Sequence, residues 1–301
     1  MVHFYQKRVR IVLLSILAIL GVTLSINAES LFHLAESPSS QIRYEIVERS
    51  QSKIHTVTIP HDSNYTIVPA VSGLQPLADF ITEDGDRIIA AINGGYFDPA
   101  NHKTTSFVVR ESQIVADPRF NERLVDNPDL KQYLSKIFDR AEFRRYSCNS
   151  QVKYDIQLHS APIPDDCTLI DSLGGGPGLL PQDTSEAEAF TAYENGEKIR
   201  DAIGSTSLNA RSAIGITQNG DVILAMAAQR SQQPLNSGIS LAEFREYLAD
   251  LGAVKAMNLD GGSSASLYYQ DRLIYGKVGK DGTQIKRPIK SVLLVKQNEG
   301  R

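Results

Sequence analysis

Several sequence features are missing from this 301-residue chain, and each absence narrows the class of protein. There is no low-complexity tract and no repeat with the period of a solenoid or a propeller. Extended disorder is therefore not expected beyond the N-terminal region, and a repeat architecture is not expected at all. Apolar residues make up 42% and charged residues 22% of the chain, as in ordinary soluble globular proteins.

An excess of positive charge is also missing. The chain has 31 basic and 35 acidic side chains, which gives a net charge of −4. Residues 1–28 contain three basic and no acidic residues, so their removal would leave 28 − 35 = −7. This charge argues against a general binder of nucleic acids or anionic membranes, although a local basic pocket remains possible.

Cysteine is scarce, since Cys148 and Cys167 are the only two. They lie far apart and lack neighbours at metal-ligand spacing, so we expect neither a metal site nor another cofactor. In an exported protein such a pair predicts a disulfide. It would close a loop of about twenty residues and stabilise the fold by about 3 kcal/mol in the loop-entropy treatment. Two unpaired buried thiols are the alternative.

The N-terminus has the pattern of a secretory signal. Lys7, Arg8 and Arg10 precede an apolar run over residues 11–26, and Ala28 provides a small residue for cleavage. The run also approaches the length of a membrane span, so an uncleaved membrane anchor is the alternative. Either way, the basic flank predicts that the rest of the chain lies outside the cytoplasm, in the periplasm or the extracellular space. No cysteine follows the run, so a lipoprotein anchor is not indicated.

The remaining chain is predicted to be a linker over residues 29–42 and a single domain over residues 43–301. Predicted strands outnumber helices, and hairpins outnumber crossovers. This pattern predicts an α+β fold with a large, mostly antiparallel or mixed sheet and flanking helices. The predicted strands are residues 44–47, 55–59, 65–71, 88–92, 106–110, 113–116, 154–158, 212–217, 221–227, 266–269, 272–275 and 291–295.

Four segments are predicted to be helices. They are residues 74–83, 128–138, 184–195 and 240–251. Asn127 and Pro128 suit the start of the second helix. Capping boxes are predicted at Ser185 with Glu188 and at Ser240 with Glu243, and a glycine follows each of these two helices.

Three largely apolar segments run into glycine-rich ends at distant places in the chain. These ends read NGG from position 93, GGGPG from position 174 and DGGSS from position 260. One such end is an ordinary turn, whereas three predict strand ends that converge on a ligand cleft. Glycines permit close approach to the backbone, and their amides with the serine hydroxyls would form a set of donors for an anionic or polyhydroxylated ligand.

Four motifs together resemble the phosphodiester glycosidase family. They are NGGYF at 93–97, GGGP at 174–177, ARSAIG at 210–215 and NLDGGSS at 258–264, and the resemblance covers roughly residues 65–297. The chain departs from the family pattern in reading Arg211-Ser212 where Arg-Thr is expected. It also carries an insertion at about residues 117–164. The resemblance implies the same fold class and a substrate that contains a phosphodiester-linked sugar.

Asp260, Arg211 and Asn93 are the candidate catalytic residues. A carboxylate at a strand end can act as acid, base or nucleophile once its pKa is tuned, and a guanidinium suits a phosphate. Asn93 could bind a sugar hydroxyl, an acetamido carbonyl or a phosphate oxygen, or it could form only an Asx-turn. The candidate substrate-binding residues are Gly94, Gly95, Gly175, Gly176, Asn258, Gly261, Gly262, Ser263 and Ser264. No G-x-S-x-G elbow is present, so Ser263 and Ser264 are expected to bind ligand and not to act as nucleophiles.

These features predict an exported hydrolase that cleaves sugar-1-phosphodiester linkages, of the N-acetylglucosamine-1-phosphodiester kind, in envelope or extracellular glycans. The departing phosphomonoester is already a stable anion, so one carboxylate, one arginine and a set of glycine amides could suffice. The alternatives are a non-catalytic glycan-binding module and an envelope scaffold protein on the same fold, because fold alone does not guarantee activity.

Overall fold

The computed structural model describes residues 41–83 and 87–298. The predicted signal or anchor at 1–28, and all but the last two residues of the predicted linker at 29–42, lie outside the described residues. Among the described residues, no helix is both long enough and apolar enough to cross a membrane.

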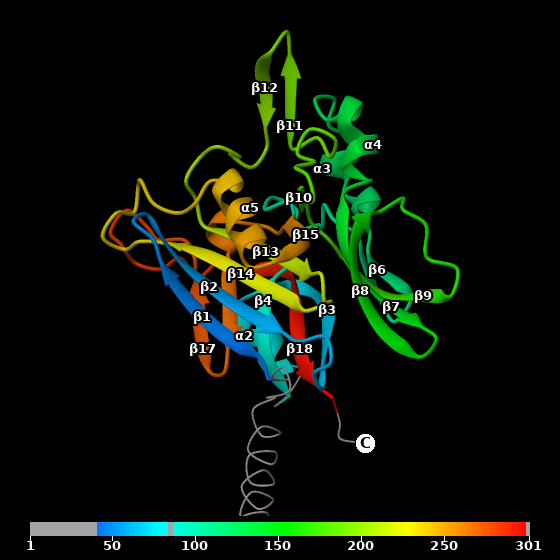
Figure 1. The fold of residues 1–301 in the computed structure, drawn as a ribbon. Helices are drawn as coiled ribbons and strands as arrows, with labels where there is room; N and C mark the ends of the chain where they lie inside the picture. Colours follow the sequence, from blue (N-terminus) through cyan, green and yellow to red (C-terminus); the bar gives the residue numbers. More distant parts are fainter. Residues whose placement is uncertain (1–40, 84–86, 299–301) are drawn as a thin grey trace, which may run out of the picture. The chain divides into compact units, whose positions relative to one another are not determined.

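Three antiparallel sheets and one two-stranded hairpin make up the fold (Figure 1). The first sheet has the order β1-β2-β14-β13-β15-β10. Its strands are β1 (Arg43–Glu48), β2 (Ser52–Ile59), β10 (Gly178–Leu180), β13 (Arg211–Thr217), β14 (Val222–Gln229) and β15 (Ala253–Asn258). The second sheet has the order β17-β16-β4-β18-β3. Its strands are β3 (Tyr65–Gln75), β4 (Ile88–Asn93), β16 (Ser266–Tyr269), β17 (Arg272–Tyr275) and β18 (Ile289–Gln297).

The third sheet has the order β6-β5-β9-β7-β8, and two of its five strands, β7 and β8, lie in the predicted insertion. Its strands are β5 (Val108–Arg110), β6 (Gln113–Ala116), β7 (Ala141–Cys148), β8 (Gln151–Leu158) and β9 (Cys167–Gly174). The hairpin of β11 (Thr191–Glu194) and β12 (Glu197–Asp201) projects from the rest of the described fold (Figure 1). The α+β class and the antiparallel pairing are confirmed, but the strands form three sheets where one large sheet was predicted.

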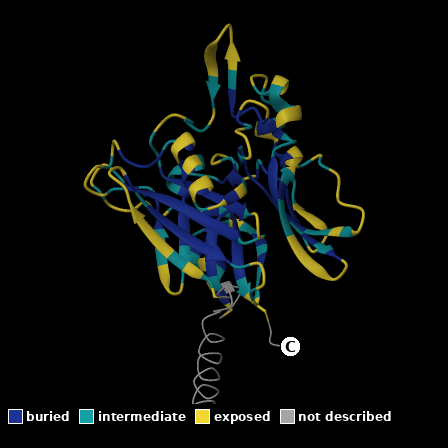
Figure 2. Ribbon diagram, in the orientation of Figure 1, coloured by how far each residue is buried: buried dark blue, intermediate teal, exposed yellow. Residues whose placement is uncertain are grey.

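Apolar side chains from facing strands form the core between the first two sheets. Val57, Ile214 and Leu224 of the first sheet belong to the same buried cluster as Ile92 and Leu293 of the second. Two helices cover the outer faces: α5 (Leu241–Asp250) packs on the first sheet and α2 (Leu77–Glu83) on the second. Figure 2 shows the central strands as continuously buried. Such two-sided burial fixes the strand ends that carry the motifs.

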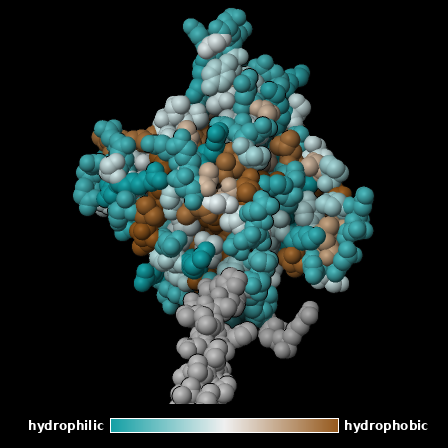
Figure 3. Space-filling model, viewed as in Figure 1, coloured by the Kyte–Doolittle hydropathy of each residue, from teal (hydrophilic) through white to brown (hydrophobic). Residues whose placement is uncertain are grey.

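The remaining helices are short and lie in the insertion or within the motif at 258–264. They are η1 (Pro118–Phe120), α3 (Glu122–Val125), η2 (Lys131–Tyr133), α4 (Leu134–Ile137) and η3 (Gly262–Ser264). The helix predicted over 128–138 is therefore shorter than expected, and the helix predicted from residue 74 begins only at Leu77, because β3 continues through Gln75. In Figure 3 the hydrophilic colour dominates the face in view, with apolar residues in scattered groups.

The prediction of a helix over residues 184–195 is wrong. Ala189 adopts a positive φ of 56°, which ends the first turn, and β11 follows. Asn195 and Gly196 also have positive φ values, of 49° and 82°, and form the turn of the β11–β12 hairpin. Asn-Gly is typical of a tight hairpin turn, but glycine also commonly follows the end of a helix. The prediction of a helix took Gly196 for such an end.

The capping box predicted at Ser185 and Glu188 is also absent. The Glu188 carboxylate instead accepts hydrogen bonds from the backbone N–H of Ala141 at 2.9 Å and of Gly178 at 2.7 Å. It thereby ties the GGGPG segment to the first residue of β7. Ser185 Oγ is buried and has no hydrogen-bond partner among the described residues.

Cys148 and Cys167 form the predicted disulfide. The two residues are paired in register at the ends of β7 and β9. The disulfide therefore joins β7 to the first residue of β9. Gly174 of the second motif lies at the opposite end of β9.

Candidate active site

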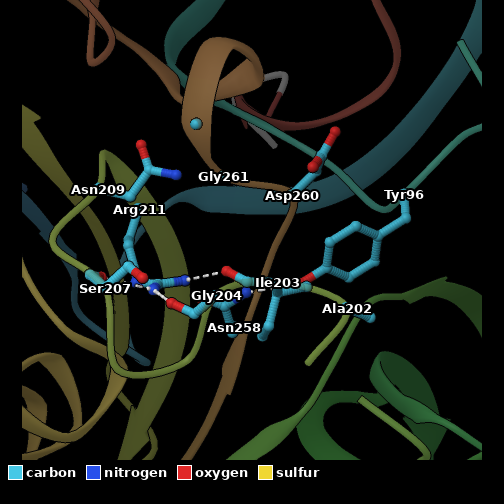
Figure 4. A pocket seen from close by; sticks show the side chains of 11 residues that line it. Tyr96, Ala202, Ile203, Gly204, Ser207, Asn209, Arg211, Asn258, Asp260 and Gly261 are labelled. Carbon is cyan, nitrogen blue, oxygen red and sulfur yellow. Dashed lines mark hydrogen bonds between the residues drawn. The ribbon is translucent and has the colours of Figure 1, made fainter. Parts of the chain in front are cut away.

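A cleft of about 410 Å³ opens where two of the glycine-rich motifs meet a loop that precedes β13 (Figure 4). Its lining comes from three parts of the chain, around residues 96, 202–211 and 258–262. The lining residues are Tyr96, Ala202, Ile203, Gly204, Ser207, Asn209, Arg211, Asn258, Asp260, Gly261 and Gly262. The volume lies in the range that small-molecule sites occupy.

Asp260 lies two residues after the end of β15 and lines this cleft. Its backbone N–H donates to the carbonyl oxygen of Gly94 at 3.0 Å, which joins the first motif to the last. Burial raises the pKa of the Asp260 carboxyl to about 6, against the lowering effects of the Ser264 hydroxyl, the Arg287 guanidinium and the Gly261 amide. A carboxyl group with such a pKa can exchange a proton near neutral pH, as acid–base chemistry requires.

Asn93 lies behind Asp260 and is fully buried within the protein. Its Nδ2 donates to the carbonyl oxygen of Asp260 at 2.6 Å. Its Oδ1 accepts from Ser212 Oγ at 2.6 Å and from the backbone N–H of Ser266 at 3.0 Å. Asn93 thus connects β4, β13 and the start of β16 to the catalytic candidate. The side chain is not among the groups that line the cleft, so this geometry suits positioning of Asp260 and not contact with a sugar.

Four of the predicted substrate-binding glycines use their amides inside the protein. The N–H of Gly94 donates to Ser291 O, that of Gly95 to Ser291 Oγ, that of Gly175 to Ala141 O and that of Gly176 to Asn258 O. Their lack of a Cβ allows these segments to pack closely: a Cβ on Gly175 would lie 2.9 Å from Asn258 O, and one on Gly95 would overlap Gly174 O. The N–H groups of these four glycines therefore bind oxygen atoms of the protein itself, whereas they were expected to face a ligand.

Gly261 and Gly262 differ from the other glycines because they line the cleft. The N–H of Gly262 donates to Ala210 O at 2.7 Å, and Gly262 has a positive φ of 59° that favours glycine. Their direct contact with a ligand stays a prediction.

Arg211 begins β13 and lines the cleft, but its guanidinium is largely occupied. Nε donates to Ile239 O at 3.1 Å and Nη1 to Ile203 O at 3.4 Å. Nη2 donates to the carbonyl oxygens of Gly204 at 2.6 Å and Ser207 at 3.1 Å (Figure 4). Since a guanidinium has five N–H groups, these four bonds leave little for a phosphate. Arg211 fastens the loop at 203–207 to the cleft, and its role as a phosphate ligand stays a prediction.

Asn258 and Tyr96 form a hydrogen-bonded pair in the cleft wall. Asn258 Nδ2 donates to Tyr96 Oη at 2.7 Å, and Tyr96 Oη donates to the carbonyl oxygen of Gly176 at 2.8 Å. Burial, assisted by the Asp260 carboxylate, raises the pKa of Tyr96, so its hydroxyl stays protonated. Asn258 Oδ1 is buried and has no hydrogen-bond partner among the described residues. Tyr96 therefore links the second motif, at 174–177, to the cleft wall. The backbone N–H groups of Gly175 and Gly176 do not face the cleft.

The two serines of the last motif lie beside Asp260 but do not line the cleft. Ser263 Oγ accepts from Arg287 Nη1 at 2.9 Å. Ser264 Oγ is buried close to Asp260, yet it makes no hydrogen bond of normal geometry within the described part of the chain. Ser264 thus lies beside the Asp260 carboxyl, whereas Ser263 binds Arg287, and direct contact of either serine with a ligand stays a prediction.

Sequence reasoning did not identify the loop before β13 or Arg287 as parts of the site. Ala202, Ile203, Gly204, Ser207 and Asn209 carry no motif, and the loop reaches the cleft because Arg211 binds three of its carbonyls. Adjacency of Asn209 to the ARSAIG motif was the only available signal. Over residues 41–83 and 87–298, no three His, Cys, Asp or Glu side chains gather into a group that could hold a metal ion.

Fold and cleft together define a sheet-rich α+β protein with a titratable carboxylate in a polar, small-molecule-sized cleft. Residues 86–296 match the family described as phosphodiester glycosidase, and the chain belongs to that family of glycosidase-like hydrolases. A search of curated proteins found no significant match.

The solved structures of similar fold include two with TM-scores above 0.5. One is the zebrafish N-acetylglucosamine-1-phosphodiester alpha-N-acetylglucosaminidase catalytic domain, auto-inhibited by its pro-peptide. It is 16% identical with a TM-score of 0.58, and the match covers 88% of this chain and 85% of that one. The other is a hypothetical protein from Synechocystis, 19% identical with a TM-score of 0.54. That match covers 87% of this chain and 64% of the Synechocystis chain. At these identities the likeness shows the fold alone.

Proposed function

We propose that this protein is an exported hydrolase that cleaves sugar-1-phosphodiester linkages, of the N-acetylglucosamine-1-phosphodiester kind, in envelope or extracellular glycans. The observation that carries the proposal is the Asp260 carboxyl group, which lines a polar cleft with a pKa of about 6. Membership of the phosphodiester glycosidase family supports the reaction class, and the zebrafish structure named above supports the substrate type.

The reaction breaks the bond between the anomeric carbon and the phosphate oxygen. Water adds its oxygen to the anomeric carbon, and the products are the free sugar and a phosphomonoester, with one proton released. The phosphomonoester leaves as a stable anion, so the chemistry needs little protonation of the leaving group. The ionised Asp260 carboxylate would stabilise the positive charge that develops at the anomeric carbon, or accept the proton of the attacking water.

Three groups would hold Asp260 in place for this step, namely the buried Asn93 and Gly94 and the partly buried Arg287. Asn93 binds its carbonyl oxygen, Gly94 accepts its N–H, and the charge of Arg287 acts on its carboxylate. Arg211 would contribute its charge and its one remaining N–H to the phosphate side of the cleft. No carboxylate lies within ion-pair distance of Arg211 in the described residues, so the positive charge of this wall favours an anionic ligand.

Export is supported by the Cys148–Cys167 disulfide, because such bonds persist in oxidising compartments. The apolar run at 11–26, with its basic flank, would act as a signal peptide or as an uncleaved anchor. The substrate would accordingly be a glycan of the envelope or of the surroundings.

The test is release of N-acetylglucosamine from UDP-N-acetylglucosamine, or from a simple N-acetylglucosamine-1-phosphodiester, by the purified protein. Asp260→Asn should reduce kcat by about a hundredfold or more, as the loss of an acid–base group typically does. Asp129→Asn, a matched change at an exposed position, should retain full activity. Full activity in Asp260→Asn would refute the role of this carboxylate. Binding without turnover by the wild-type protein would instead identify a glycan-binding module.

A further inference from the structure

Asn209 presents a single kind of hydrogen-bonding group to the cleft. Its Oδ1 accepts from Lys277 Nζ at 3.0 Å and from the backbone N–H of Ala210 at 3.0 Å. These two bonds fix the orientation of the amide, because only the carbonyl oxygen can accept from an ammonium group. The amide nitrogen, Nδ2, is left with no hydrogen-bond partner among the described residues, and Figure 4 shows it turned toward the segment of Gly261 and Asp260.

The backbone at Gly262 keeps this amide nitrogen accessible. A Cβ on Gly262 would stand 3.5 Å from Asn209 Nδ2, in van der Waals contact with it. The positive φ of 59° at Gly262 is a conformation that disfavours other residues. A side chain at position 262 would therefore occupy space next to Nδ2 that glycine leaves free.

Lys277 places a positive charge directly behind this donor. It is partly buried, and within the described part of the chain it forms no ion pair. Among the described residues, the only side-chain hydrogen bond of Lys277 is the one to Asn209. Burial lowers the pKa of Lys277, and no carboxylate raises it. An amide whose carbonyl oxygen is bound to an ammonium is polarised, so its N–H groups become stronger donors.

Arg211 adds to the same electrostatic environment. Its guanidinium also lacks a carboxylate partner within ion-pair distance in residues 41–83 and 87–298, and it lines the cleft together with Asn209. The side of the cleft at Asn209 is thus rich in donors and positive charge, whereas Asp260 supplies the negative charge. A ligand group that suits this side carries acceptor oxygens and negative charge.

We propose that Asn209, held by Lys277, is the residue that binds the phosphate oxygen of the substrate and thereby selects phosphate-linked sugars. This inference rests on the proposed function and adds the site of phosphate recognition to it. Asn209 would donate directly to the phosphate. Lys277 is a positioning residue that acts through Asn209, and the anomeric carbon would lie between the phosphate and Asp260.

The experiment compares binding of N-acetylglucosamine 1-phosphate with binding of free N-acetylglucosamine by isothermal titration calorimetry. In Asn209→Asp the donor becomes a carboxylate of the same shape, and affinity for the sugar phosphate should fall on the order of a hundredfold, as expected for a charge-assisted hydrogen bond replaced by repulsion. Lys277→Met should weaken the sugar phosphate by about tenfold. Neither variant should change the affinity for the free sugar.

Two further variants separate phosphate recognition from general damage to the fold. Lys277→Arg keeps a cation and should restore most of the affinity, whereas Lys280→Met removes an exposed lysine and should have no effect. With a phosphodiester substrate, Lys277→Met should raise KM and leave kcat nearly unchanged. Equal affinity of wild type, Asn209→Asp and Lys277→Met for the sugar phosphate would overturn the inference, as would a wild-type protein that binds both ligands equally.

The binding measurement also separates this inference from the proposed function. A wild-type protein that prefers the sugar phosphate through Asn209 but hydrolyses no phosphodiester would support the inference and refute the enzyme. A wild-type protein that hydrolyses the substrate, while both variants bind the sugar phosphate normally, would support the proposed function and refute the inference.

Discussion

The side-chain amide of Asn93 donates a hydrogen bond of 2.6 Å to the backbone carbonyl of Asp260, across 167 residues of sequence. Both residues were recognised from glycine-rich motifs, but the structure gives them different positions. Asp260 lines the cleft, whereas Asn93 is buried behind it and bonded on both sides of its amide. The residue from the first motif therefore holds the residue from the last motif in place, and of the two only Asp260 lines the cleft.

Asn93→Ala should destabilise the protein strongly. The substitution leaves Ser212 Oγ, the N–H of Ser266 and the carbonyl of Asp260 without partners, and each buried orphan group costs about 1–3 kcal/mol. We expect a loss of about 3–4 kcal/mol after partial relaxation, measured by denaturant unfolding. The exposed Asn64→Ala should change stability by less than about 0.5 kcal/mol. Equal stability of the two variants would show that the network around Asn93 is not needed.

Gly95→Ala should be far more harmful than Gly73→Ala. A Cβ at position 95 would overlap Gly174 O and approach Ser106, whereas a Cβ at position 73 meets nothing within 4 Å. Neither glycine has a positive φ, so the comparison isolates steric overlap from backbone strain. We expect Gly95→Ala to cost about 2–3 kcal/mol or more and to reduce activity, since it displaces Tyr96. Gly73→Ala should be neutral or slightly stabilising, because alanine reduces the entropy of the unfolded chain. Thermal unfolding of both variants checks this.

Local signals predicted those parts of the fold that are determined locally. Asn219-Gly220 between two apolar segments predicted the hairpin of β13 and β14, and Ser240 with Glu243 predicted the start of α5 through a capping box that the structure contains. In both cases the turn or cap is satisfied by residues within a few positions. The glycine-rich motifs likewise predicted that distant strand ends converge.

Parts that depend on long-range contacts were not predictable in the same way. Glu188 matches a capping box in sequence, but its carboxylate binds the N–H groups of Gly178, ten residues away, and of Ala141, 47 residues away. The glycine amides were expected to face a ligand, but Ser291 and Ala141 accept from them. In a sequence, a glycine needed for close packing and a glycine needed for ligand approach are identical.

The Cys148–Cys167 disulfide should stabilise the third sheet independently of the site. The sequence separation is 19 residues, for which the loop-entropy treatment gives a contribution of about 3 kcal/mol. The double substitution Cys148→Ser with Cys167→Ser should lower the free energy of unfolding by about 2–4 kcal/mol. Added reductant should destabilise the wild type to a similar extent and leave the double variant unchanged. A wild type insensitive to reductant under unfolding conditions would contradict this.

The pH dependence of hydrolysis should follow the ionisation of Asp260. If the carboxylate form is the active one, kcat/KM should rise with pH up to about 6 and then level off, because the pKa of Asp260 is about 6. An ordinary exposed aspartate would place this rise near pH 4. A profile that instead falls above pH 6 would assign Asp260 as a general acid, contrary to the mechanism proposed.

Asp260→Asn should stabilise the folded protein at neutral pH while it removes activity. Burial raises the pKa of Asp260 to about 6, whereas an aspartate in the unfolded chain has a pKa of about 3.9. Between these values the folded state binds more protons than the unfolded state, so the contribution of Asp260 to stability falls as pH rises from 4 to 6. Above pH 6 the folded protein carries the full cost of a buried charge, and below pH 4 it carries none.

Removal of this charge should therefore raise the free energy of unfolding by about 1–2 kcal/mol at pH 7, after allowance for the partial exposure of Asp260, and change it little at pH 4. Denaturant unfolding of wild type and Asp260→Asn at the two pH values measures the difference, with the exposed Asp129→Asn as the matched control. An Asp260→Asn variant less stable than wild type at pH 7 would mean that the carboxylate is stabilised by its neighbours more than burial penalises it. Arg287 and the Ser264 hydroxyl are the groups that could do so. In that case Asp260 would titrate below pH 6, and the rise in kcat/KM would move to the same lower pH.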